Sequence, residues 1–124
     1  MQDEPTPTEL IKAVADFLRN EIAPAIKGHN AFKLRVGINA LDLVTRQLSL
    51  AEAGDATEAA RLKQMLGIDG ALLDQNRSLA QKIADGEIDL QTPGLAEHLW
   101  QTTLDKLAVD QPNYASYKRE LGSK

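Results

Sequence analysis

Apolar residues recur at the spacing of an α-helix along most of the chain, and helix-breaking residues divide them into about five segments. No stretch alternates apolar and polar residues for long enough to predict a strand. The pattern therefore predicts an all-α fold, with at least two thirds of the residues helical, and short connections favour antiparallel helices in an irregular bundle. The expected helices run from about Thr8 to Ala23, Asn30 to Leu50, Ala56 to Leu66, Gly70 to Ala84, and Pro93 to Asp110.

Several helix starts carry capping signals. Thr6 and Glu9 have the spacing of a capping box, and Pro7 occupies the first helical position, where its missing N–H costs nothing. Asp55 and Glu58 repeat that spacing with Asp in the capping place, so a separate helix is expected to begin there. Two further N-caps are expected at Asp69 and Thr92.

The second segment, 30–50, is apolar on most of its sides. A helix of that kind belongs at the buried centre of a bundle. We also expect Trp100 to be at least partly buried, with an acceptor for its indole N–H. The apolar residues of the second segment are Phe32, Leu34, Val36, Ile38, Leu41, Leu43, Val44 and Leu48.

The length of 124 residues suits one domain, which we expect to span 1–124, with 1–5 flexible and 113–124 forming a C-terminal tail. The chain has no cysteine, which excludes disulfides and thiolate chemistry. Its net charge is −4 and it has no long basic run, so nucleic acid is not an expected ligand. No apolar run approaches the ~18 residues of a membrane span, and the start of the chain has no secretory pattern. A cytoplasmic location is therefore expected.

Candidate chemistry is sparse. His29 and His98 are the only histidines, and neither has a partner at a metal-ligand spacing. We expect His29 to cap or face solvent in a loop and His98 to lie on the surface. No serine sits in a glycine-flanked elbow and no glycines form a phosphate loop. The sequence thus predicts no metal, no cofactor and no catalytic residue, and it does not favour an enzyme.

A polar stripe crosses the second segment. Arg35, Asn39, Asp42 and Arg46 are spaced 4, 3 and 4 residues apart, so they share one edge of the helix. One interpretation is structural, with Asp42 and Arg46 paired along the helix. In the other, Arg35 and Asn39 face a cleft and bind an anionic or carbonyl group, because polar groups on a buried helix need partners.

The end of the last long helix carries a second polar group. Lys106 and Asp110 are four residues apart, and Tyr114 follows the helix end. In one interpretation, these residues stabilise the C-terminal end of the helix. In the other, they lie at the entrance of a ligand-binding site. The candidate ligand-binding residues are therefore Arg35, Asn39, Lys106, Asp110 and Tyr114.

Three stretches together resemble one family of small bacterial proteins of uncharacterised function. The family is encoded beside, or occasionally joined to, aminoglycoside-phosphotransferase-like kinases and acyl-CoA dehydrogenases. The resemblance covers nearly the whole chain and implies an all-α fold in a setting of acyl-CoA or phosphotransfer metabolism. It implies no activity and no catalytic residues. The stretches are Pro5-Thr6-Pro7-Thr8-Glu9-Leu10 with Val14, Phe17 and Leu18, then Arg35 to Leu41, and Lys106 to Tyr114.

Three functions are therefore open. The leading hypothesis is an accessory or interaction module for a partner enzyme of that metabolic setting. The alternative is a small-ligand-binding protein or minor enzyme that holds a carboxylate, phosphate or acyl-CoA group with Arg35, Asn39 and Lys106. A third is a homo-oligomeric structural protein. Convergence of the candidate residues on one pocket would favour a ligand, whereas an exposed apolar patch would favour a partner protein.

Overall fold

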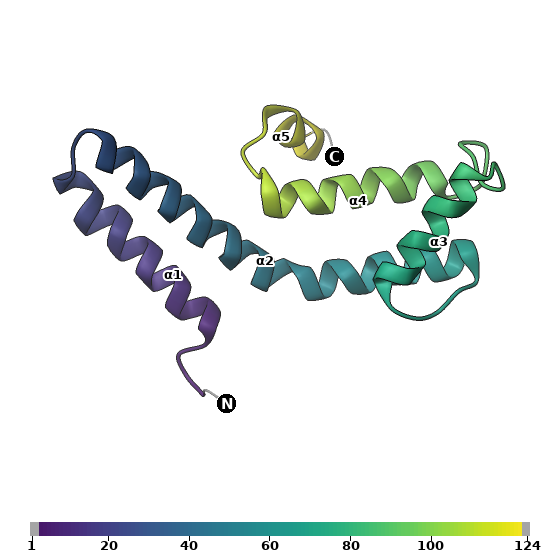
Figure 1. The fold of residues 1–124 in the computed structure, drawn as a ribbon, viewed down its shortest axis with the longest axis horizontal. Helices are drawn as coiled ribbons and strands as arrows, with labels where there is room; N and C mark the ends of the chain where they lie inside the picture. The colour runs from purple at the N-terminus through teal and green to yellow at the C-terminus, as the bar shows by residue number, and fades with distance from the viewer. Residues whose placement is uncertain (1–2, 123–124) are drawn as a thin grey trace. The chain divides into compact units, whose positions relative to one another are not determined.

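In the computed structural model, which describes residues 3–122, helices make up 78% of the described chain, and the described residues contain no strand (Figure 1). The all-α prediction is therefore confirmed. The chain divides into two compact units, unit 1 over 1–51 and unit 2 over 52–124, and each is described by itself. The expected single domain stays a prediction. The flexibility expected of 1–5 and the end of the expected tail fall partly on 1–2 and 123–124, which lie outside the described residues.

Helix α1, Pro7–Phe17, begins at the predicted capping box. The Thr6 hydroxyl accepts a hydrogen bond from the Glu9 backbone N–H at 3.2 Å, and the Glu9 carboxylate accepts one from the Thr6 N–H at 2.8 Å. Two donors that the first turn leaves without a helical partner are satisfied in this way. A π-helical turn over Leu18–Ile22 and a 3-10 turn over Ala23–Ala25 follow.

Helix α2 is one continuous helix, His29–Leu66, so the predicted break between two helices is wrong. A helix-interior glycine such as Gly54 costs only about 1 kcal/mol relative to alanine, which a long helix tolerates. The Thr57 hydroxyl donates to the Gly54 carbonyl at 2.9 Å, inside the helix. The spacing of Asp55 and Glu58 is therefore no helix start. The helix ends before Gly67, whose φ of +71° suits glycine.

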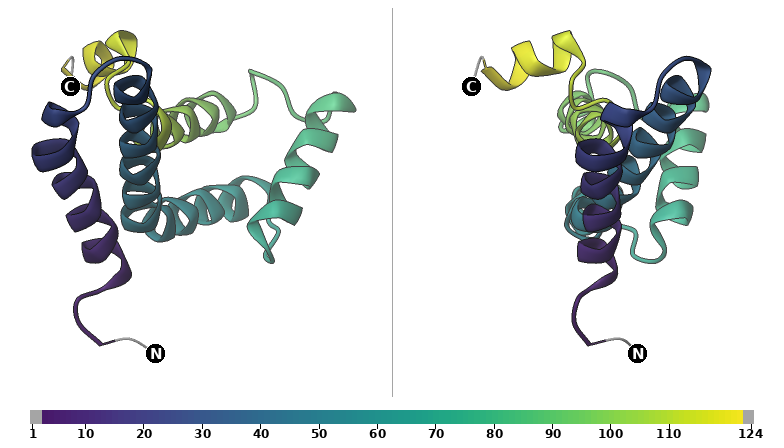
Figure 2. Two further views of the ribbon diagram at one scale, coloured as in Figure 1. Left: turned by 60° about the vertical axis from the view of Figure 1, so that its left-hand side comes forward. Right: turned by 90° about the vertical axis from the view of Figure 1, so that its left-hand side faces the viewer.

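Unit 1 is a helical hairpin of α1 and the first part of α2, which run side by side in opposite directions (Figure 2). Its buried apolar residues are Ala15 and Ile38. The expectation that 30–50 is the buried centre is wrong, since Phe32 and Val36 remain 55% and 51% exposed. The physical reason is geometric: inside unit 1 a single neighbouring helix covers this stretch, and one neighbour shelters only one line of side chains.

Unit 2 contains the main core. It is built from the rest of α2 with α3, Leu72–Ala84, α4, Leu95–Asp110, and the short α5, Ala115–Gly122, into which the expected tail folds. Among the described residues, no helix is apolar for long enough to cross a membrane. The core cluster consists of Leu62, Leu79, Ile88 and Leu95, with Met65, Leu66 and Leu72 packed against it.

The starts of α3 and α4 differ from the predicted ones. Ala71 rather than Asp69 is the N-cap of α3, and Gly94 rather than Thr92 is that of α4. The Thr92 hydroxyl instead accepts a hydrogen bond from the Asp89 N–H at 3.0 Å, so it closes the preceding turn. Gly94 then adopts a φ of +91°, a conformation that glycine reaches without strain.

The core of unit 2 generates a stability prediction. Replacing the fully buried Leu62 by alanine should lower the free energy of unfolding by about 2–5 kcal/mol, because it leaves a cavity. The matched control is Leu90→Ala, at a position 70% exposed, where the change should stay within about 0.5 kcal/mol. Urea denaturation of the two variants measures both values. Equal effects would show that the core lies elsewhere.

Candidate functional site

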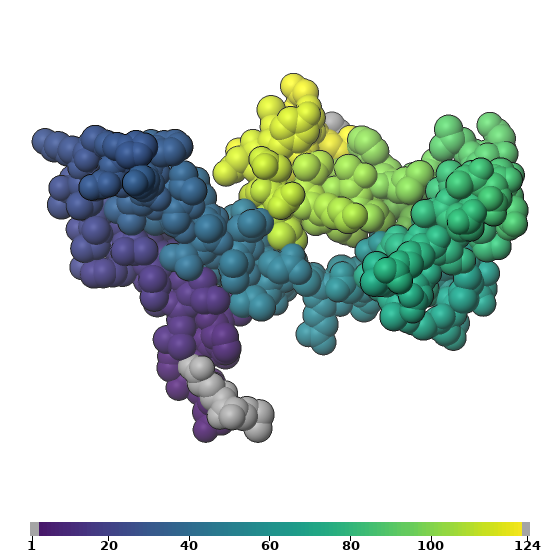
Figure 3. Space-filling view, viewed as in Figure 1, coloured from purple at the N-terminus to yellow at the C-terminus, as the bar shows by residue number. Residues whose placement is uncertain are grey.

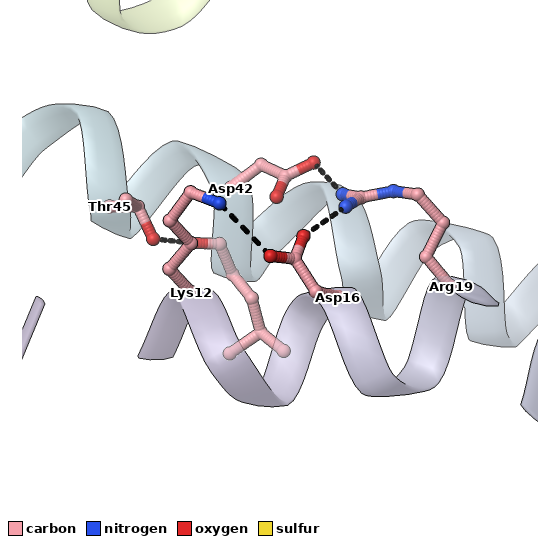
Figure 4. A network of polar contacts seen from close by, with 6 residues as sticks. Lys12, Asp16, Arg19, Asp42 and Thr45 are labelled. Atoms are coloured by element: carbon pink, nitrogen blue, oxygen red, sulfur yellow. Dashed lines mark hydrogen bonds and ion pairs between the residues drawn. The ribbon is translucent and has the colours of Figure 1, made fainter. Parts of the chain in front are cut away.

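One flank of the hairpin in unit 1 is closed by ion pairs (Figure 4). Asp16 accepts a hydrogen bond from the Lys12 ammonium at 3.0 Å and another from the Arg19 guanidinium at 2.9 Å, and Arg19 also bonds Asp42 on α2. The hydrogen bond from Lys12 is the main cause of a lowered pKa of Asp16, and the bond to Asp42 raises the pKa of Arg19. Asp42 of the predicted stripe is therefore bound to α1. This flank fastens the two helices together.

Arg35 and Asn39 of the same stripe are exposed on α2. The guanidinium carbon of Arg35 lies 6.0 Å from the centre of the Phe32 ring, a cation–π distance. The Phe32 ring also stacks on His29 at 6.4 Å. Asn39 makes no side-chain hydrogen bond within the described chain. Because this part of α2 is exposed, water can satisfy both groups without a ligand.

The second predicted group lies in unit 2. Lys106 and Asp110 are exposed on α4, and no ion pair joins them within residues 3–122. Tyr114 is 52% exposed and leads into α5, its carbonyl accepting a hydrogen bond from the Lys118 N–H at 3.0 Å. Arg35 and Asn39 belong to unit 1 and the other three residues to unit 2. Neither unit by itself holds the whole set, and the anion site stays a prediction.

A polar cluster in unit 2 was missed by the sequence analysis. Arg61 of α2 donates from Nε to Nδ1 of His98 at 3.3 Å and from Nη2 to the Thr102 hydroxyl at 3.2 Å. The same Nη2 lies 3.7 Å from the Asp105 carboxylate. His98, Thr102 and Asp105 follow one another at helical spacing along α4, so one guanidinium holds a line of three side chains. Arg61 thereby fastens α4 to α2.

His98 is 2% exposed, so its predicted place on the surface is wrong. It lies three residues after the buried Leu95, on the same side of α4. This spacing was the feature of the sequence that could have predicted its burial. Burial is the main cause of a lowered pKa of His98, the Arg61 charge lowers it further, and Glu58 opposes the shift. Since Nδ1 accepts from Arg61, the proton of the neutral ring is on Nε2.

Two amides connect α3 to α2. Gln75, 2% exposed, donates from Nε2 to the carbonyls of Ile68 at 2.8 Å and Ala59 at 3.4 Å. Its Oε1 is buried without a partner among the described residues. The Asn76 amide donates to the Glu58 carboxylate at 3.0 Å. These contacts and those of Arg61 surround the core cluster and orient the three helices on it.

The polar cluster is better suited to holding helices than to chemistry. The one buried imidazole is shut off from solvent, and its Nδ1 is engaged by Arg61. Among residues 3–122, no group of three or more His, Cys, Asp or Glu side chains is arranged to hold a metal ion. The cluster therefore joins α4 to α2.

The exposed surface of α4 and α5 offers large apolar side chains. Trp100 is 53% exposed, so it is about half covered, and its indole N–H donates to the Glu120 carboxylate of α5 at 3.3 Å. The expected acceptor is thus present. In the view of Figure 3 the atoms of α5 lie above those of α4. We call the following residues the α4–α5 surface: Leu99, Trp100, Tyr114 and Leu121, which are 41%, 53%, 52% and 49% exposed.

Comparison with known proteins gives one family. Residues 24–114, well over half of the chain, match the family described as Domain of unknown function (DUF6285). The match includes all of α2, α3 and α4, and therefore the whole polar cluster of unit 2. No curated protein and no solved structure matches the chain.

The buried imidazole generates a pH prediction. In the unfolded chain His98 binds a proton near its ordinary pKa of 6.5, whereas in the folded chain the pKa is lower. Below pH 6.5 the unfolded state therefore holds more protons, and the free energy of unfolding should fall as the pH falls through this window. Above pH 6.5, the contribution of the neutral His98 to the free energy of unfolding is fully present.

Urea denaturation at a series of pH values measures this slope. His98→Gln keeps an acceptor for Arg61 but does not titrate, so its slope below pH 6.5 should be shallower than that of the wild type. His29→Gln, the same substitution at an exposed position, is the control. An identical slope in all three proteins would contradict the assignment to His98.

Proposed function

The chain belongs to the DUF6285 family, and we propose that it works as an interaction module that docks a partner enzyme through the α4–α5 surface. The observation that carries the proposal is the exposure of Trp100, the only tryptophan of the chain. Tryptophan and tyrosine are enriched among the residues that dominate binding energy at protein interfaces. Leaving a tryptophan half exposed is unfavourable for an isolated chain and favourable where a partner covers it.

The Trp100 side chain is also held in place before any partner arrives. Its hydrogen bond to Glu120 joins α4 to α5, so the indole is oriented by a contact between two helices. An anchor that is already oriented loses less conformational entropy on binding. This favours specific docking of one partner over non-specific hydrophobic association.

Charged residues follow Leu99 along one side of α4 and supply orientation. Leu99, Lys106 and Asp110 are 7 and 4 residues apart, so they follow one stripe of α4. The two opposite charges are exposed and are not paired with each other in the described chain. At the edge of an interface such charges select the partner and its register more than they add affinity. In this proposal Lys106, Asp110 and Tyr114 bind a protein.

The class of partner comes from the resemblance stated above. A phosphotransferase-like kinase or an acyl-CoA dehydrogenase is the proposed partner enzyme, in the cytoplasm of a bacterium. The chain would position or regulate that enzyme, and the reaction would belong to the partner.

Binding of the purified chain to a kinase and a dehydrogenase of these classes, each immobilised, tests the proposal. We expect one of them to bind, and Trp100→Ala to weaken the binding by about tenfold or more, the effect of losing a central anchor. The control is Leu73→Ala on α3, at a position 62% exposed and outside the α4–α5 surface, which should bind as the wild type does. Absence of binding to both enzymes, or equal binding by Trp100→Ala, would refute the proposal.

A further inference from the structure

The outer flank of the hairpin in unit 1 carries a regular line of residues on each helix. One line consists of Leu10, Val14 and Phe17 of α1 and Glu21 of the π-helical turn that follows, at spacings of 4, 3 and 4 residues, and we call it the α1 seam. All four are exposed, with Leu10 at 41% and both Val14 and Phe17 at 49%. Alternating spacings of 3 and 4 are those of helices that pack lengthwise against one another.

Helix α2 carries a second line with the same spacings. Lys33, Gly37, Ala40 and Val44 are 4, 3 and 4 residues apart, and we call them the α2 seam. All four are exposed, Val44 at 42%. Gly37 is notable because glycine weakens a helix interior, and a Cβ atom at this position would meet nothing within 4 Å. Nothing in the described chain therefore explains its lack of a side chain.

Both seams lie on the same flank of the hairpin. On α1, Asp16 follows the buried Ala15 and Val14 precedes it, so the two lie on opposite sides of the buried line. On α2, Asp42 and Gly37 lie on opposite sides of the buried Ile38 in the same way. The ion pairs join α1 to Asp42 on one flank (Figure 4). The two seams therefore share the other flank.

The two seams are complementary to each other, in charge and in size. Nearest the turn between the helices, the α1 seam has Glu21 and the α2 seam has Lys33. Farther from the turn, the α1 seam carries the bulky Phe17, whereas the α2 seam carries Gly37 and Ala40. A surface that holds two mutually complementary lines side by side is self-complementary under a two-fold axis parallel to the helices.

We propose that this flank binds a second copy of the chain, so that two hairpins form a four-helix bundle. The α1 seam of each copy packs on the α2 seam of the other, every helix has antiparallel neighbours, and Phe17 packs over the space that Gly37 and Ala40 leave open. Glu21 of one copy pairs with Lys33 of the other at one end of the bundle. The interface belongs to unit 1 and is separate from the α4–α5 surface, so either proposal can fail without the other.

Sedimentation equilibrium over a range of protein concentrations tests for the dimer. We expect the wild type to dimerise and Val14→Glu to raise the dissociation constant by at least tenfold. The matched control is Val36→Glu, which places the same charge on α2 outside the seams, at a position 51% exposed compared with 49% for Val14. This control should dimerise normally. A monomeric wild type, or equal effects of the two substitutions, would overturn the proposal.

A charge-reversal pair tests the register without altering apolar residues. Glu21→Lys alone sets two lysines against each other across the interface, and Lys33→Glu alone sets two glutamates, so each variant should dimerise more weakly than the wild type. An equimolar mixture restores opposite charges at both contacts and should form a heterodimer, detected by native mass spectrometry. Because both positions are exposed, folding should be unaffected. A mixture that dimerises no better than its components would overturn the two-fold arrangement.

Discussion

The packing of α4 on α2 in unit 2 depends on the guanidinium of Arg61, which contacts several side chains of α4. Arg61 reaches from α2 to three side chains of α4, those of His98, Thr102 and Asp105, which follow one another at helical spacing. A partly buried arginine needs its donors satisfied, and the rotation of α4 that presents His98, Thr102 and Asp105 meets this need. That rotation turns Leu95 and Leu104 inward and leaves Leu99 and Trp100 outside. The position of the exposed anchor therefore follows from a contact in the interior.

Unit 1 is governed by a different constraint. Two helices alone can enclose only one line of side chains, here marked by Ala15 and Ile38. The two flanks of the pair then differ. Ion pairs of Asp16, Arg19 and Asp42 join the helices on one flank, and the other flank carries the two seams. The ion pairs are exposed, and pairs of that kind add little stability. Apolar packing on the open flank would therefore contribute more to the hairpin than the ion pairs do.

The sequence predicted what local chemistry determines. The fold class followed from periodicity, and the start of α1 followed from Thr6, Pro7 and Glu9, because a capping box is formed within four residues. The continuous α2 was missed because Gly54 and Asp55 resemble a boundary locally, while the cost of a single interior glycine is too small to end a long helix. A short capping or glycine signal does not indicate how many helical residues precede and follow it.

The buried residues and the site were harder to predict for a tertiary reason. Apolar residues on most sides of 30–50 predicted a central helix. The exposure of a helix, however, depends on how many other helices pack around it, and its own sequence does not determine that number. His98 was predicted to lie on the surface, whereas its position three residues after the buried Leu95 places it inside. The bond between Arg61 and His98 joins residues 37 positions apart, beyond the reach of a spacing argument. Arg35 and Asn39 do share one edge of α2, as predicted. A ligand was expected for them because that edge was expected to be buried, and both residues are exposed.

The single indole of the chain has a spectroscopic consequence. Trp100 is the only tryptophan, and its N–H is bonded to the carboxylate of Glu120 on α5. Light absorbed at the red edge of the protein spectrum therefore excites one chromophore, at the contact between the last two helices. Its emission wavelength and lifetime report whether α5 is seated on α4, with no second indole to dilute the signal. The molecule thus carries a built-in optical reporter of the surface that we propose for partner binding.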